Sequence, residues 1–503
     1  MASPEPASHR SDPYLNGEGA PFLPAGDDES PESLDSDIPF QKHSNHGLII
    51  KLFVIYLAIG MGGPMIQSPL TRIVESIACR NYWNAHDPSQ LPGPGQISEG
   101  MCKIPEVQRE VTTIIGYREF FNAFLTSTFA LPYGLLADHY GRKLAIRLAS
   151  AGFLFNSVFS IAPLWLPSMF PLRTMWFGAV GWVLGGGPVL LFALFWSMIA
   201  DATAEAERDT VILRFGIATV SAGFLANVTS SVLMKFDSRV PLMAGCGLLF
   251  AGLLVANLLP ETLRKKSQET TISADTSISL TSLVLRIKKT IWSYRFICYN
   301  YPVAVILPAF FVTQLAGGSA FLVQYISIRF HRTIADATLL VALQHAFTIP
   351  VLFFILPQIS ERLRASISIL QSDLLLARIS VMLLALGLFG IGLSSSINTL
   401  IPSLLLHAAG AGFVLITRGL ITGLASREET ARLYTLIEAT QSIGEVTASL
   451  YITNSLNWGL GRGGLWIGLP WLIVSFLLAL IALVLGMLRL SPRAEDVPSG
   501  STH

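Results

Sequence analysis

The chain alternates between long apolar runs and short polar connections. Twelve of the apolar runs are long enough, at about 20 residues each, to cross the hydrocarbon core of a bilayer as helices. Their approximate centres are Ala58, Leu125, Phe155, Gly186, Gly223, Phe250, Thr313, Pro350, Leu386, Gly410, Gly444 and Ser475. This pattern predicts an all-α membrane protein with twelve transmembrane helices. Because twelve is even, both ends of the chain are expected on one side of the membrane.

The composition supports a membrane protein. Of the 503 residues, 51% are hydrophobic and 13% are charged, whereas soluble proteins contain about 25% charged residues. The mean hydropathy is +0.55. A bilayer requires no polar cover over the outer faces of the helices, so few charges suffice.

Polar stretches divide the chain into a predicted order of domains. The first is a disordered acidic tail, and two halves of six helices follow, separated by a cytoplasmic loop. The boundaries are 1–45 for the tail, 46–260 for the first half, 261–300 for the central loop, 301–490 for the second half and 491–503 for a C-terminal tail. A long outer loop is expected at 72–110, between the first and second spans.

The distribution of charge predicts the orientation. The first 45 residues contain nine acidic and two basic side chains, so the rest of the chain contains 24 acidic and 32 basic ones. Basic residues gather in the turns after even-numbered spans, among them Arg142, Lys143, Arg264, Lys265, Lys266, Arg362, Arg364, Arg427 and Arg432. Cytoplasmic turns carry such an excess. We therefore expect both termini in the cytoplasm, a location in the plasma membrane and no binding to nucleic acid.

The segment Gly134-Leu-Leu-Ala-Asp138-His-Tyr-Gly141-Arg142-Lys143 is a charged turn between the second and third spans. Its glycines permit a sharp turn and close backbone approach. Asp138 is expected either to cap the next helix or to pair with a cation of a neighbouring helix. The spacing resembles the G-x-L-a-D-r-x-G-r-k loop of major facilitator superfamily transporters. In that family the loop is a cytoplasmic gate, which implies the same role for Gly134, Asp138, Gly141, Arg142 and Lys143.

Further segments resemble a fungal group of this superfamily that is distantly similar to the proton-coupled folate transporter family. They are Glu75 with Cys79-Arg-Asn-Tyr-Trp83, Gly116-Tyr-Arg-Glu-Phe-Phe121, Gly185-Gly-Gly-Pro188 and Asp373 with Ala377-Arg378. The resemblance implies the major facilitator fold, in which two six-helix halves enclose a central cavity. Fungal proteins of this kind are often exporters of small organic compounds, including secondary metabolites.

Cys79 and Cys102 lie in the expected outer loop. An oxidising environment there favours a disulfide between them, and two unpaired thiols are the alternative.

Three polar residues of the second span are candidates for the substrate or proton pathway, because polar groups inside a membrane are expensive. Arg118 and Glu119 point about 100° apart on a helix, so each is expected to meet a partner on another helix. Either a role in the pathway or a structural pair between helices fits this position. Asn122 lies four residues after Arg118 and shares its face.

The eleventh span carries Glu438, Gln441 and Glu445 at positions i, i+3 and i+7, which form one polar stripe. Such a stripe is expected to face the bundle interior or a water-filled cavity. The hypothesis is that Glu438 or Glu445 exchanges a proton or binds a polar group of the substrate. Hydrogen bonding to neighbouring helices is the alternative.

Glycine and proline interrupt the first and seventh spans, which occupy equivalent places in the two halves. Paired interruptions indicate the central site of a carrier, and tight helix packing explains them equally well. Gln67 and Gln314 lie beside these interruptions and are candidates for hydrogen bonding to a substrate. Gln344 and His345 of the eighth span are weaker candidates.

The sequence contains no nucleotide-binding P-loop, metal-ligand cluster or nucleophile triad, so we expect neither an enzyme nor a cofactor or metal. The expected partners are the lipid bilayer, a small-molecule substrate and protons, and no obligate protein partner is evident. From the resemblance, the favoured function is efflux by secondary active transport with alternating access. Proton-coupled uptake of an anionic nutrient and a non-transporting nutrient sensor on the same fold are the alternatives.

Overall fold

The computed structural model describes residues 46–90, 97–204, 207–259, 300–424 and 427–488. Within these ranges the secondary structure is helical, and no strand is present. The predicted tails at 1–45 and 491–503 lie outside the described residues, as does the predicted loop at 261–300 apart from its last residue.

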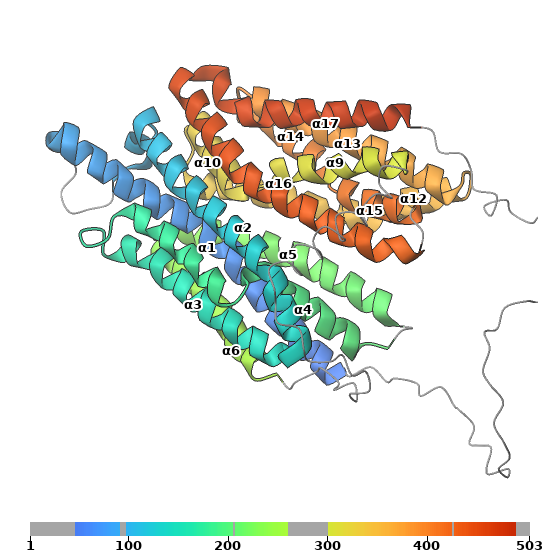
Figure 1. Ribbon diagram of the computed structural model, residues 1–503. Coiled ribbons are helices and arrows are strands. Elements are labelled where there is room, and N and C mark those ends of the chain that lie inside the picture. Colours follow the sequence, from blue (N-terminus) through green and yellow to red (C-terminus); the bar gives the residue numbers. More distant parts are fainter. Residues whose placement is uncertain (1–45, 91–96, 205–206, 260–299, 425–426, 489–503) are drawn as a thin grey trace, which may run out of the picture. The chain divides into compact units, whose positions relative to one another are not determined.

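Six membrane-crossing segments form the first half of the structure, coloured blue to green in Figure 1. They are α1 (His46–His86), α2 (Pro105–Tyr140), α3 (Arg142–Trp165), η3 (Leu172–Leu184) continued by α4 (Gly187–Ala202), α5 (Arg208–Met234) and α6 (Arg239–Asn257). A helix rises 1.5 Å per residue, so the 24 residues of α3 extend about 36 Å, which exceeds the hydrocarbon core of about 30 Å. The short helices η1 (Pro88–Gln90) and η2 (Glu99–Cys102) lie between α1 and α2.

The second half, coloured yellow to red, repeats this arrangement with more interruptions (Figure 1). Its elements are α9 (Tyr301–Leu315), α10 (Ser319–Arg329), α11 (Ile334–Pro350), η5 (Val351–Ile355), α12 (Leu356–Arg364), α13 (Ile369–Leu393), α14 (Ile397–Ala409), α15 (Phe413–Leu424), α16 (Arg427–Arg462), η6 (Gly464–Gly468) and α17 (Leu469–Met487). Six crossing segments result when elements joined end to end are taken together.

The described helices account for the predicted spans. Ten helical stretches are long and apolar enough to cross a membrane, and the bent pair α9–α10, with an angle of 55° between its parts, is a further candidate. The remaining segment is α16, which has 36 residues and carries the polar side chains predicted for the eleventh span. Each centre predicted from the sequence falls within or beside these helices, so the predicted all-α bundle of about twelve helices is confirmed.

Most of the buried apolar side chains belong to two large cores, and a small third cluster contains Ile328, Leu456 and Leu460. One core lies within the first half and includes Leu52, Phe195 and Leu253. The other extends through the second half and continues into the part of the first half that contains Cys79 and Val111. We call this part of the molecule, where α1 ends and α2 begins, the disulfide end, and the opposite end, where α2 meets α3, the Asp138 end. The halves thus share an apolar core at the disulfide end.

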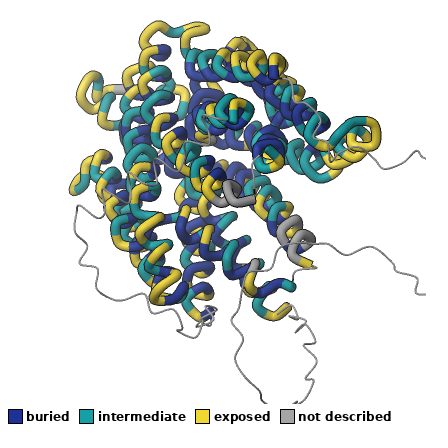
Figure 2. Tube along the Cα trace, turned by 45° about the vertical axis from the view of Figure 1, so that its right-hand side comes forward, coloured by how far each residue is buried: buried dark blue, intermediate teal, exposed yellow. Residues whose placement is uncertain are grey.

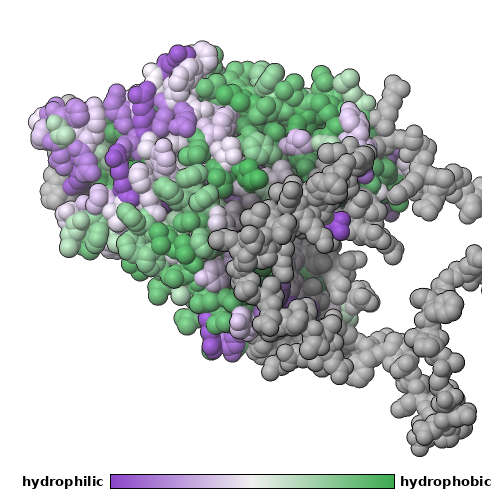
Figure 3. Space-filling model, in the orientation of Figure 1, coloured by the Kyte–Doolittle hydropathy of each residue, from purple (hydrophilic) through white to green (hydrophobic). Residues whose placement is uncertain are grey.

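Many large apolar side chains remain on the outside of the bundle. Leu131 is 70% exposed, Leu135 63% and Phe476 63%. Figure 2 shows buried residues toward the interior and exposed ones on the outer faces of the helices. Figure 3 shows that hydrophobic residues cover much of the visible surface and that hydrophilic ones gather at one end. A belt of this kind fits the hydrocarbon of a bilayer.

Two details differ from the sequence-based expectations. The expected loop at 72–110 is helical as far as His86, because residues 72–86 continue α1 and bury Val74, Ala78 and Cys79. The expected break in the first span is also absent, since α1 runs continuously through Pro64 and Pro69. Gly62 of α1 instead packs against α6, where an added Cβ would lie 2.9 Å from Gly245 O.

Candidate functional site

A cavity of about 480 Å³ lies between the two halves. Its walls come from α1, α2, α3, α4, α6, α9, α10 and α16, together with η3. The apolar lining includes Leu70, Phe153, Trp182, Phe321 and Ile452. The polar lining consists of Gln67, Arg118, Glu119, Asn122, Thr126, Asn156, Ser157, Ser160, Gln314, Glu445 and Ser449. A mainly apolar pocket of this size with a few polar groups accommodates a drug-sized molecule.

Arg118 and Glu119 form an ion pair at the cavity, with 2.6 Å between Arg118 Nη1 and Glu119 Oε1. The expectation that each would meet a partner on another helix is therefore wrong. The long, flexible arginine side chain reaches across the 100° that separates neighbouring helical positions. Arg118 Nε is buried and has no hydrogen-bond partner among the described residues. The ion pair thus places one positive and one negative group together at the cavity.

Asn122 belongs to a hydrogen-bonded wall of the cavity. Its Oδ1 accepts from Trp182 Nε1 at 2.8 Å and from Asn156 Nδ2 at 3.2 Å. These two donors fix the orientation of the Asn122 amide and leave its Nδ2 for other acceptors. The sequence pattern identified Asn122 as a candidate, but neither Asn156 nor Trp182, because uncharged side chains in apolar spans give no distinctive signal.

The predicted stripe on α16 separates into two environments. Glu445 lines the cavity, as Glu119 does from α2. Glu438 and Gln441 lie outside the lining and both accept from Arg418 Nη2, with 2.6 Å to Glu438 Oε1. Arg418 of α15 thus holds both of these side chains. Of the two glutamates, Glu445 alone lines the cavity.

Gln67 and Gln314 also line the cavity, from α1 and α9. The seventh span is interrupted beyond Gln314, where Gly318 has φ +104 and immediately precedes α10. Gly444 of α16 packs on Gln314, since an added Cβ would lie 2.9 Å from Gln314 Cβ. The interruption therefore lies beside the cavity, as expected for the seventh span.

Gln344 and His345 do not line the cavity. Gln344 Nε2 lies 2.9 Å from His407 Nδ1, and His345 Nδ1 lies 2.9 Å from Val341 O on its own helix. His345 Cδ2 also lies 3.7 Å from the position of an added Cβ on Gly223 of α5. Both residues thus have local partners within the helix bundle.

At the Asp138 end, Gly141 has φ +103 and forms the sharp turn between α2 and α3. Asp138 lies in the last turn of α2 and is exposed, and among the described residues its carboxylate neither caps α3 nor forms an ion pair. Both expectations for Asp138 fail in this conformation. Arg142 instead pairs with Asp201 of α4, with 2.6 Å between Nη1 and Oδ2. Gly134 is a helical residue with no neighbour near its Cβ position.

Comparison with known proteins decides the family. No family model matches the chain. The MFS-type transporter aprT of Aspergillus flavus, however, is 93% identical over 503 residues, which cover all of both chains. The chain belongs to the major facilitator superfamily. It is therefore a multi-pass membrane transporter and not an enzyme.

More distant similarities agree with this assignment. The MFS efflux pump atnC of Emericella nidulans is 29% identical over 97% of this transporter and 96% of its own length. The efflux pump ustT of Aspergillus flavus is 28% identical over 81% of this transporter and 82% of its own length. Among solved structures, a D-xylose–proton symporter matches with a TM-score of 0.58 at 14% identity, covering 86% of this chain and 97% of that one. This last similarity shows the shared fold.

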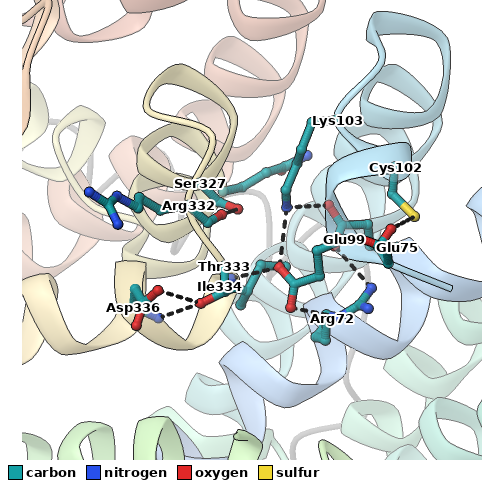
Figure 4. Close-up of polar contacts among 12 residues, drawn as sticks. Arg72, Glu75, Glu99, Cys102, Lys103, Ser327, Arg332, Thr333, Ile334 and Asp336 are labelled. Carbon is teal, nitrogen blue, oxygen red and sulfur yellow. Dashed lines mark hydrogen bonds and ion pairs between the residues drawn. The ribbon is translucent and has the colours of Figure 1, made fainter. Parts of the chain in front are cut away.

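At the disulfide end, the transporter contains a group of charges that the sequence pattern did not reveal. Cys79 and Cys102 form a disulfide with 5.3 Å between their Cα atoms, and it ties η2 to α1. Beside it, Glu75 is 1% exposed and pairs with Lys103, with 2.6 Å between Oε1 and Nζ (Figure 4). Arg72 pairs with Glu75 at 3.2 Å and with Glu99 at 2.8 Å. The one sequence signal for this group was that acidic and basic residues alternate along the segment. Because charged residues in a predicted loop usually lie in solvent, this signal did not indicate a buried group.

Proposed function

We propose that the transporter exports a small organic molecule, such as a fungal secondary metabolite, by alternating access driven by a proton gradient. Two relatives with this fold carry the name efflux pump. The observation that carries the proposal is the position of Glu445, which lines the same cavity between the two halves as the Arg118–Glu119 pair. A site between halves suits a carrier in which the halves rock around the bound molecule.

The acidic groups of the cavity supply a means of coupling. Glu119 is compensated by Arg118, whereas no ion pair of Glu445 is present among the described residues. Carboxylates that line cavities within membrane spans and have no ion-pair partner are suited to relaying protons. We assign proton binding to Glu445, and substrate binding to Arg118 and to the amide Nδ2 of Asn122. Neutralisation of Glu445 would allow the halves to close around the cavity.

The lining also defines the kind of substrate. Its walls combine aromatic and aliphatic side chains with amides and hydroxyls, so the substrate is a largely apolar molecule with several hydrogen-bonding groups. The single cationic side chain of the lining is already paired with Glu119. A polyanion would therefore find little compensation here. This favours export of an uncharged or weakly acidic compound over uptake of a folate-like anion.

We further assign the Asp138 end to the cytoplasm and the disulfide end to the outside of the plasma membrane. The basic turns Arg142–Lys143 and Arg362–Arg364 support this orientation. The disulfide supports it as well, because such bonds persist in oxidising compartments. Hydrogen bonds between described residues of the two halves lie at the disulfide end, for example from Asn457 Nδ2 to Thr113 Oγ1. The conformation is then one that is closed to the outside.

The proposal can be tested in yeast cells that lack their own drug pumps. Cells expressing the transporter, or its Glu445→Gln variant, are loaded with a panel of apolar fungal metabolites, and mass spectrometry measures the amounts in cells and medium. We expect the transporter to lower the cellular amount of at least one compound. Dissipating the proton gradient, or the Glu445→Gln substitution, should abolish this effect.

Other outcomes reject specific parts of the proposal. Greater accumulation in expressing cells, including accumulation of an added folate, would show uptake. Export that persists in Glu445→Gln with unchanged dependence on external pH would remove Glu445 as the proton site. A useful matched control is Glu110→Gln, because the partly exposed Glu110 side chain pairs with Arg173 and does not line the cavity.

A further inference from the structure

The charged group at the disulfide end contacts the second half of the transporter at two places. Glu99 of η2 binds the first turn of α11, and Gln108 of α2 binds Gln324 of α10. Both contacts join segments that are more than 200 residues apart in the chain. We propose that Glu99, Gln108 and Gln324 are the outer gate of the transporter, and that the Cys79–Cys102 disulfide positions Glu99 for this task. The proposal rests on the alternating access and orientation proposed above.

The first contact places a carboxylate at the start of a helix. Ile334 N donates to Glu99 Oε2 at 2.9 Å (Figure 4). The first N–H groups of a helix have no partner within it, and an anion is favoured there by the helix dipole. Thr333 caps α11 through Asp336 N, so Glu99 satisfies a different N–H group. The first half of the transporter thus supplies part of the N-terminal cap of a helix in the second half.

Glu99 is held in place from its own half. Its Oε1 lies 2.8 Å from Arg72 Nε, and its Oε2 lies 3.5 Å from Lys103 Nζ. Glu99 begins η2, and the last residue of η2 is Cys102, which the disulfide ties to α1. With the disulfide broken, η2 can move away from α1 and carry Glu99 away from α11. The disulfide therefore stabilises the contact between the halves by fixing the position of Glu99.

The second contact is a chain of buried amides. Gln108 is 1% exposed, and its Nε2 donates to Glu75 Oε1 at 2.6 Å and to Cys102 O at 2.8 Å. Because both N–H groups are used, the amide must direct Oε1 elsewhere, and this atom accepts from Gln324 Nε2 at 3.2 Å. Gln324 Nε2 also donates to Thr112 Oγ1 at 2.9 Å. Glu75 therefore sets the orientation in which Gln108 can bind Gln324.

The contact between Gln108 and Gln324 differs from a purely structural contact because it contains an unpaired buried acceptor. Gln324 is 2% exposed, and its Oε1 is buried with no hydrogen-bond partner among the described residues. A buried acceptor without a donor is destabilising, and contact with water relieves this when the halves part. In the closed gate, hydrogen bonds therefore hold the two halves together, while the unpaired Gln324 acceptor favours their separation. Such a balance suits a contact that has to break in every transport cycle.

The test measures access to the central cavity from the side of the disulfide end and requires no knowledge of the substrate. Ser157 of the cavity lining is changed to cysteine after Cys246 and Cys298 are replaced by alanine. Intact cells are treated with a membrane-impermeant thiol reagent, and the labelling rate is measured. We expect Glu99→Gln to raise the rate about two- to fivefold, the range for loss of a charge at a helix end, and Gln324→Leu to raise it about two- to tenfold, the range for loss of a hydrogen bond. Glu110→Gln is the matched carboxylate control and should leave the rate unchanged.

A double-mutant cycle tests the role of the disulfide. If the bond acts through Glu99, the Cys79→Ser/Cys102→Ser variant raises labelling by itself but adds nothing to Glu99→Gln. Multiplicative effects, or unchanged labelling in Glu99→Gln and Gln324→Leu at normal surface levels, overturn the proposal. A separate Ser89→Cys reporter, exposed at the disulfide end, shows which side this end faces. This reporter therefore distinguishes an error in the proposed orientation of the transporter from an error in the proposed gate residues.

Discussion

Gly116 should be essential for closing the transporter at the disulfide end. It lies in α2 against Thr453 of α16, and an added Cβ would lie 1.8 Å from Thr453 Oγ1 and 2.8 Å from Thr453 Cβ and Cγ2. Thr453 is 2% exposed, and its hydroxyl donates to Ser449 O at 2.6 Å. A β-branched side chain has few rotamers in a helix. In Gly116→Ala the two helices must therefore move apart, since rotation of Thr453 leaves its Cβ too close.

The magnitude follows from the packing. Adding a methyl group to a tightly packed contact destabilises it by about 1–3 kcal/mol. Because the contact joins the two halves, the added methyl group raises the free energy of the conformation that is closed at the disulfide end. The free energy of the open conformation, in which the contact is broken, stays the same. The equilibrium should then shift toward the open form by about fivefold to more than a hundredfold. The labelling rate of a Ser157→Cys reporter from the side of the disulfide end should rise accordingly, and transport should slow.

Two variants control this experiment. Gly116→Ala combined with Thr453→Gly restores the space between the helices and should recover much of the closed form. Gly247→Ala adds a methyl group to another helix at an exposed position with no heavy atom within 4 Å of its Cβ, and should change nothing. Labelling of Gly116→Ala at the rate of the unchanged chain would refute the reasoning. Failure of the Thr453→Gly rescue would mean that a contact other than Thr453 is responsible.

Three further substitutions test the cavity and the disulfide. Glu445→Gln should abolish transport driven by a pH gradient while exchange of substrate between the two sides continues, as a comparison of net flux with exchange in proteoliposomes would show. Trp182→Phe removes the 2.8 Å hydrogen bond to Asn122, which is worth about 0.5–1.5 kcal/mol, so substrate affinity should fall about two- to tenfold in a binding titration. Cys79→Ser/Cys102→Ser opens a loop with a sequence separation of 23, and should lower the free energy of unfolding by about 3 kcal/mol, measured as a lower Tm in detergent.

The sequence was sufficient for the fold because a bilayer imposes simple requirements. Each span must be a long apolar helix, and this requirement is visible in windows of about 20 residues. The same reasoning located Gln67, Asn122, Gln314 and Glu445, because polar groups inside apolar spans are few and their placement is constrained.

The details that sequence reasoning missed depend on side-chain reach or on distant segments. Arg118 and Glu119 pair with each other because a long side chain overrides the angular separation of adjacent positions. Gln108 and Gln324 meet although 216 positions separate them, and no local pattern records such a contact. The stripe on α16 was correctly placed on one helix, but the helix extends past the cavity, so Glu438 and Glu445 enter different surroundings.

The two ends of the transporter hold complementary interactions. At the disulfide end, Gln108 and Gln324 connect the halves, whereas at the Asp138 end the Asp138 carboxylate is exposed and Arg142 pairs with Asp201 within its own half. When two halves rock about a central site, opening one end brings the other end together, so contacts at the Asp138 end are expected to form as those at the disulfide end break. Asp138, unpaired in this conformation, is then the group available for a contact when the disulfide end opens. On this reasoning, loosening the outer gate and removing Asp138 should oppose each other, and a variant that combines Gln324→Leu with Asp138→Asn should label at a rate between those of the two single variants.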